Sequence, residues 1–132
     1  MSTTAEHLHA YRRMDISLDT FPYAGTTTTV EALFMGVPVV VLKASGRDAT
    51  HAHNVGVSLL SQVGLHELIA HDEDEYAEMA VNLALSPERL RSLRDTLRSK
   101  LLASPLCQGQ AFMRDVEFEY RRMWLRYCGE EN

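Results

Sequence analysis

The chain has 132 residues and a mass of 14.9 kDa, a size that fits one domain and excludes two separately cored ones. Hydrophobic residues make up 45%, enough for a packed core, and the two cysteines, Cys107 and Cys128, indicate free thiols in a reducing compartment, the cytoplasm or nucleus. The net charge of −5 argues against nucleic acid as a partner, and the longest apolar run, Val37–Leu42, is too short to cross a membrane.

The first half of the chain alternates short β-type runs with helical patterns, which indicates an α/β fold. One run is rich in β-branched residues, as is typical of a strand buried on both faces of a parallel sheet. In chain order, the pattern predicts a helix at Glu6–Met14, a strand at Asp15–Asp19, a loop to Gly25, a helix ending at Gly36, the buried strand at Pro38–Leu42, a loop at Lys43–Thr50, a helix at Ala52–Val63 and a short strand at Leu68–Ala70.

The second half contains helical patterns alone. We expect a helix from Asp72 to about Leu85, a second that starts at Ser86-Pro87, and a third over Gln110–Tyr127. The last has a wide apolar stripe that must lie on another surface. Three strands are fewer than most sheets contain, so residues 1–132 are predicted to be a single, incomplete domain, the carboxyl-terminal part of a larger α/β unit.

The strongest chemical signal is the segment from Gly25 to Glu31, which follows a strand and opens a helix. Free main-chain N–H groups and the positive end of the helix dipole attract phosphate at such a junction, and threonine hydroxyls add donors. An ordinary loop with a helix cap explains the same residues equally well, because the segment matches neither a GxGxxG motif nor a Walker loop.

Glu31 has two possible roles. Its spacing from Thr28 is that of a capping box, but its carboxylate also suits the two ribose hydroxyls of a nucleotide.

Asp19, at a strand end, is expected to bind nearby loop amides, and no catalytic residue is identifiable. The two HxH pairs, at residues 7–9 and 51–53, have no third ligand at suitable spacing, so no metal is expected.

Several longer segments of the chain form one ordered set of motifs. They are Asp15-Ile16-Ser17-Leu18-Asp19-Thr20-Phe21-Pro22-Tyr23-Ala24-Gly25-Thr26-Thr27-Thr28-Thr29, Glu31-Ala32-Leu33, Met35-Gly36-Val37-Pro38, His51-Ala52-His53-Asn54-Val55-Gly56-Val57-Ser58-Leu59-Leu60, Ala103-Ser104-Pro105-Leu106-Cys107 and the set Tyr120, Met123, Trp124 and Tyr127. These motifs closely resemble the carboxyl-terminal catalytic region of the O-GlcNAc transferase and SPINDLY family. The resemblance covers about residues 6–128 and is greatest for the SPINDLY branch.

The resemblance implies the second Rossmann-like half of a GT-B glycosyltransferase, with a short parallel sheet, flanking helices and a long C-terminal helix. Such enzymes are inverting and need no metal or other cofactor; they transfer GlcNAc from UDP-GlcNAc, or fucose from GDP-fucose, to Ser/Thr of cytosolic and nuclear proteins. Thr26, Thr27 and Thr28 match residues around the diphosphate, Glu31 matches a ribose contact, and His7 matches a histidine beside the base.

The family's tetratricopeptide repeats, its first Rossmann-like half and the lysine that it uses near the diphosphate have no counterpart in this sequence. The 132 residues alone are therefore expected to be inactive as a transferase. The alternatives are a noncatalytic nucleotide-binding or protein-interaction module, and an unrelated nucleotide-dependent enzyme. Nucleoside diphosphate binding, compared with NAD binding, distinguishes these three functions.

Overall fold

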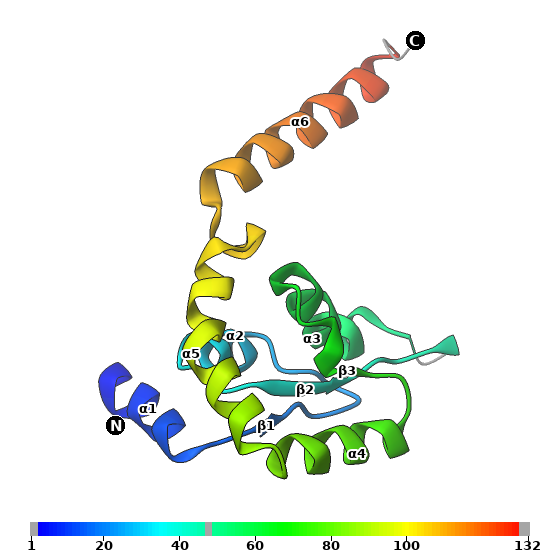
Figure 1. Cartoon of the computed structure of the whole chain (residues 1–132). Coiled ribbons are helices and arrows are strands. Elements are labelled where there is room, and N and C mark those ends of the chain that lie inside the picture. Colours follow the sequence, from blue (N-terminus) through cyan, green and yellow to red (C-terminus); the bar gives the residue numbers. More distant parts are fainter. Residues whose placement is uncertain (1–2, 47–48, 130–132) are drawn as a thin grey trace.

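The computed structural model describes residues 3–46 and 49–129 and contains a parallel three-stranded sheet flanked by helices (Figure 1). The strands are β1 (Ser17–Leu18), β2 (Val39–Leu42) and β3 (Ile69–Ala70), and their order in the sheet follows the chain. The helices are α1 (Thr4–Ala10), α2 (Thr27–Phe34), α3 (His51–Val63), α4 (Glu73–Ala84), α5 (Pro87–Ala103) and α6 (Gly109–Cys128), with 3-10 turns at Tyr11–Arg13, His66–Leu68 and Pro105–Cys107. The predicted α/β fold with a short parallel sheet and a long C-terminal helix is confirmed.

The helix boundaries follow local signals in the sequence. Asp72 caps α4 by accepting a hydrogen bond from the main-chain N–H of Glu75 over 2.8 Å, and Pro87 occupies the first turn of α5. Gly36, with φ at 79°, follows the end of α2 as predicted. The predicted first strand is shorter than expected, and part of the predicted 43–50 loop, residues 47–48, lies outside the described residues.

The core surrounds β2. Its first three residues are at most 1% exposed, because β1 and β3 pair with its two edges and helices cover its faces. Helix α5 directs the predicted leucine stripe into this core: Leu93, Leu97 and Leu101 are buried, and Leu90 packs partly against them. Helix α5 also packs against α2, and Arg98 lies over the ring of Phe34 at the C-terminal end of α2.

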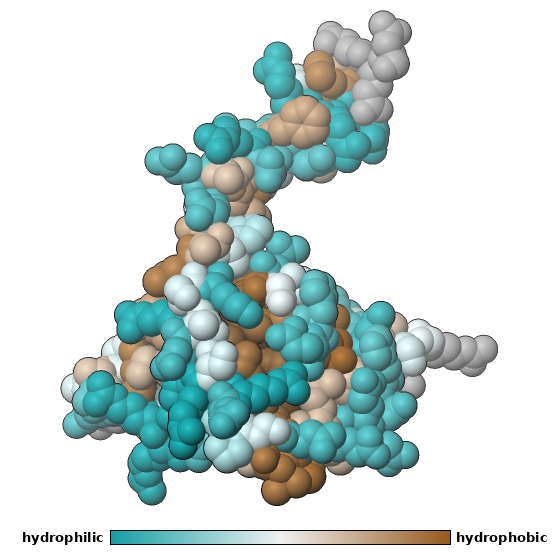
Figure 2. Space-filling model, in the orientation of Figure 1, coloured by the Kyte–Doolittle hydropathy of each residue, from teal (hydrophilic) through white to brown (hydrophobic). Residues whose placement is uncertain are grey.

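Helix α6 extends away from the body of the molecule (Figure 1), and none of its residues is buried. In the described chain the apolar stripe is largely exposed, on an arm that projects from the rest of the molecule (Figure 2), so that the surface expected to cover it stays a prediction. The exposed side chains are Phe112, Met113, Phe118, Tyr120, Met123, Trp124 and Tyr127. No helix in the described part of the chain is long and apolar enough to span a bilayer.

Candidate functional site

The loop between β1 and α2 is held by the carboxylate of Asp19, directly after the carboxyl end of β1. Asp19 Oδ1 accepts hydrogen bonds from the main-chain N–H of Gly25 over 2.7 Å and of Thr20 over 3.1 Å. The loop is also attached to α3, because the N–H of Ala24 donates to the carbonyl of Ala52. The expectation that Asp19 binds loop amides is confirmed, and the start of α2 is thereby fixed beside the sheet.

Gly25 lies so close to its neighbours that no side chain fits there. A Cβ at this position would lie 2.7 Å from Thr29 Oγ1, 2.8 Å from Thr28 Oγ1 and 2.9 Å from Asp19 Oδ1. The glycine therefore brings the main chain close to two hydroxyls. Its own N–H donates to Asp19 and is therefore not available as a donor to phosphate.

The four residues after Gly25 form the threonine turn (Thr26–Thr29), which begins α2. The main-chain N–H groups of Thr27, Thr28 and Thr29 have no acceptor within the described chain, and Thr26 supplies no side-chain cap. The first turn of α2 contains no acidic residue, whereas that of α4 contains three. Thr26, Thr27 and Thr28 are exposed and Thr29 is buried. The turn thus presents amide and hydroxyl donors to solvent at the positive end of a helix.

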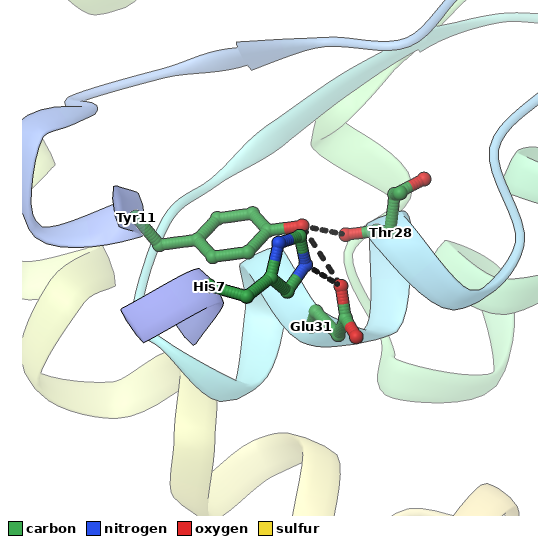
Figure 3. Close-up of polar contacts among 4 residues, drawn as sticks. All are labelled: His7, Tyr11, Thr28 and Glu31. Carbon is green, nitrogen blue, oxygen red and sulfur yellow. Dashed lines mark hydrogen bonds and ion pairs between the residues drawn. The ribbon is translucent and has the colours of Figure 1, made fainter. Parts of the chain in front are cut away.

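Glu31, one turn further along α2, contacts the N-terminal segment rather than its own helix start (Figure 3). Its Oε2 lies 3.0 Å from Nε2 of His7 and accepts the Tyr11 hydroxyl over 3.0 Å. The predicted capping box with Thr28 is therefore wrong, because the carboxylate is bound by two donors from α1 and the following turn. A capping box that sequence analysis missed lies in α1, between Thr3 and Glu6.

Hydrogen bonding shifts the ionisation of this cluster. The bond from His7 is the main cause that lowers the pKa of Glu31, and the bond from Tyr11 lowers it further. Burial and the neighbouring carboxylate raise the pKa of Tyr11. Glu31 is consequently ionised and Tyr11 protonated at neutral pH. The Tyr11 hydroxyl and the His7 Nε2 both donate to one negatively charged oxygen.

A second cluster lies behind Asp19. Gly56, in α3, leaves space for Asp19 Oδ2, which would lie 2.3 Å from a Cβ at that position. The Tyr76 hydroxyl donates to the main-chain oxygen of Asp19 over 2.8 Å, and Phe21 stacks on the ring of His53 with centroids 6.3 Å apart. The His53 ring nitrogens are buried without a hydrogen-bond partner in the described chain. Burial of the carboxyl among these side chains raises the pKa of Asp19, although the hydrogen bonds from the two loop amides and the nearby His53 partly oppose this rise.

The raised pKa of Asp19 predicts that ionisation of this carboxyl destabilises the fold as pH rises. The pKa of the Asp19 carboxyl is about 4 in the unfolded chain and higher in the folded chain. At pH values between these two pKa values, the folded state binds more protons than the unfolded state. We expect the free energy of unfolding of the wild type to fall through this window relative to that of Asp19→Asn, which cannot ionise. Urea titrations at a series of pH values measure the difference, and parallel profiles for the two proteins would contradict the prediction.

Other hollows of the surface lie away from these residues. One, of about 560 Å³ at the junction of α4 and α5, is lined by Leu85, Ser86, Pro87, Glu88, Arg89 and Arg91 and includes no residue of the threonine turn. Among residues 3–46 and 49–129, no group of three or more His, Cys, Asp or Glu gathers as metal ligands would. The loop at the carboxyl end of β1 therefore remains the candidate site.

Comparison with known proteins places this geometry in a family. The profile of Glycosyl transferase family 41 matches residues 1–116. The chain belongs to this family. It is 57% identical over 123 residues to a probable UDP-N-acetylglucosamine–peptide N-acetylglucosaminyltransferase SPINDLY of Eustoma exaltatum subsp. russellianum, and the match covers 93% of this chain and 13% of that protein. The corresponding SPINDLY protein of Arabidopsis thaliana is 53% identical over 126 residues, with 96% and 13% covered.

Two further relatives agree with the resemblance found in the sequence. The SEC protein of Arabidopsis thaliana, with the same transferase description, is 34% identical over 125 residues, covering 94% of this chain and 12% of that protein. The solved structure of a mutant O-GlcNAc transferase from Thermobaculum terrenum superposes with a TM-score of 0.84 at 40% identity, covering 98% of this chain and 24% of that chain. The resemblance to the O-GlcNAc transferase and SPINDLY family is confirmed, and the chain spans about an eighth of the length of its SPINDLY relatives.

Within this family 41 chain, the structure brings the predicted site residues to one end of α2. Thr26, Thr27 and Thr28 form its exposed first turn, and Glu31 and His7 are in direct contact. Sequence analysis missed Tyr11, although its spacing of four residues from His7 is that of neighbours on one helical face. The roles of these residues toward a ligand stay predictions.

Proposed function

We propose that this chain is the nucleotide-sugar-binding part of a GT-B protein O-glycosyltransferase. The donor is UDP-GlcNAc or GDP-fucose, and the acceptors are Ser/Thr side chains of cytosolic or nuclear proteins. Thr26, Thr27 and Thr28 hold the diphosphate together with the free N–H groups of the threonine turn. Glu31 accepts the ribose hydroxyls, and His7 lies beside the base.

One observation carries the proposal: unpartnered main-chain N–H groups and exposed hydroxyls converge at a helix start beyond the carboxyl end of a parallel strand. Ligands of open α/β sheets bind at this edge, and a helix start suits a diphosphate. The family 41 match and the names of the relatives support the transferase class. Strand β1 lies at an edge of the sheet, and its residue Leu18 is 52% exposed. This exposed edge agrees with a domain whose sheet is completed by other parts of the enzyme.

The chemistry assigned to this chain is stabilisation of the leaving group. When an acceptor hydroxyl attacks the anomeric carbon, negative charge develops on the departing nucleoside diphosphate. N–H and O–H donors fixed in place beforehand stabilise that charge without reorganisation, and they need no metal for this purpose. Inversion follows from a single displacement at the anomeric carbon. The remaining groups of the reaction belong to parts of the enzyme outside these 132 residues.

Removal of single hydroxyls from the threonine turn tests the diphosphate role. We expect Thr27→Ala and Thr28→Ala each to weaken UDP or GDP binding by about fivefold or more, because each loses a hydrogen bond worth about 1 kcal/mol. Calorimetric titration of the 132-residue chain with UDP, GDP and NAD measures this. Thr96→Ala is the matched control, because the Thr96 hydroxyl donates to the carbonyl of Ser92 within α5.

The outcomes separate the functions. Binding of UDP or GDP that both variants weaken supports the donor site, whereas binding of NAD alone indicates an unrelated nucleotide-dependent enzyme. Unchanged affinity in both threonine variants contradicts the diphosphate assignment. Failure of all three nucleotides to bind would favour a protein-interaction module, for which the exposed apolar side chains of α6 are the supporting observation.

A further inference from the structure

Tyr11 meets the carboxylate of Glu31 and has no role in the function proposed above. It is 7% exposed, and its hydroxyl lies 3.0 Å from Glu31 Oε2 and 3.5 Å from the main-chain oxygen of Thr28. One hydroxyl proton serves one acceptor at a time, and the shorter bond to a charged oxygen is the stronger. The Tyr11 hydroxyl therefore holds Glu31 directly beside the threonine turn.

The two oxygens of Glu31 are in different situations. Oε2 accepts from the Tyr11 hydroxyl and from Nε2 of His7, so its usual acceptor capacity is used. Figure 3 shows the second oxygen pointing away from both rings, and no partner for it occurs in the described chain. The side chain of Glu31 is 26% exposed, so it is not sealed off from solvent. The cluster fixes the orientation of the carboxylate and leaves one acceptor free.

We propose that Tyr11 is a positioning residue that orients Glu31 toward the ribose hydroxyls, so that the site selects ribonucleotides over 2′-deoxyribonucleotides. The inference rests on the proposed function, because it assigns Tyr11 a role in the same donor site. Tyr11 and His7 together bind one carboxylate oxygen, and the rotation of the Glu31 side chain is thereby restricted. A ligand then gains the hydrogen bonds of its diol without the entropic cost of ordering the carboxylate.

The ring packing of Tyr11 supports a role for the hydroxyl itself. The ring lies edge-on to that of His7, with centroids 5.7 Å apart, and forms part of the core cluster. Phenylalanine retains this packing, so Tyr11→Phe removes only the hydroxyl. Tyr76→Phe is a matched control, because the Tyr76 hydroxyl is also partly buried but donates to the main chain at Asp19.

The test compares the affinities of GDP and UDP with those of their 2′-deoxy counterparts, measured by calorimetry or NMR titration of the full 132-residue chain. We expect the wild type to prefer the ribonucleotide and Tyr11→Phe to reduce that preference about threefold to tenfold. Glu31→Gln should reduce it at least as much, and Tyr76→Phe should leave the ratio unchanged. A purely structural role of Tyr11 would weaken both ligands equally and leave the ratio intact.

A second readout does not require a ligand. In Tyr11→Phe, the carboxyl resonance of Glu31 should titrate at a higher pH than in the wild type, because one of the bonds that lower its pKa is lost. An unaltered titration of Glu31, or an unaltered ribose preference in a chain that binds GDP or UDP, would overturn the positioning role and leave the donor site standing. Absence of nucleotide binding by the wild type would instead contradict the proposed function.

Discussion

Gly25→Ala is expected to reduce nucleoside diphosphate affinity by at least about tenfold, the largest loss among the site variants. The new Cβ would lie 2.7 to 2.9 Å from the oxygens of Thr29, Thr28 and Asp19, whereas such contacts require more than 3.0 Å. The oxygens of Thr29 and Asp19 have little room to move, because Thr29 is buried and Asp19 is bound to two loop amides. The loop must therefore shift, and the threonine turn shifts with it.

Calorimetric titration of Gly25→Ala with UDP and GDP measures this loss. Gly109→Ala is the control, because nothing lies within 4 Å of a Cβ at that position at the start of α6. The control variant should bind as the wild type does. If Gly25→Ala binds with wild-type affinity while retaining its fold, the close approach at Gly25 has no part in recognition.

Leu97→Ala is expected to lower the free energy of unfolding by about 2 to 5 kcal/mol, a large share of the stability of a domain of this size. The Leu97 side chain is fully buried and belongs to the core cluster around β2. Truncation removes apolar contacts and leaves a cavity that the surrounding core residues fill only in part. Because α5 packs against α2, the loss also weakens the packing of α2 on the core.

Leu102→Ala is the matched control on the same helix, because Leu102 is 49% exposed. We expect it to cost less than about 1 kcal/mol, since most of its surface is already in water. Urea unfolding of the three proteins, followed by circular dichroism, gives both differences. Equal destabilisation by the two substitutions would show that α5 does not close the core.

Much of the fold was predictable because its elements are encoded locally. The β-branched run at residues 39–42 forms the buried strand, Asp72 caps α4, and the leucines of α5 recur at helical spacing on the buried face. The short first strand was overpredicted, because its extent depends on pairing with β2 at Ser17 and Leu18 rather than on alternation alone. The wide apolar stripe of α6 indicated a helix but not where that helix lies.

The sequence by itself determined the family, the order of the elements and the threonine-rich helix start, because motif order and hydrophobic period are properties of neighbouring residues. Only the tertiary structure decided the partners of each polar group. Glu31 binds His7 and Tyr11, which lie 24 and 20 positions away in the sequence, and not the start of its own helix. Asp19 accepts the hydrogen bond of the Gly25 N–H. Hydrogen bonds between segments depend on how α1, β1 and α2 pack together, and no local pattern encodes that packing.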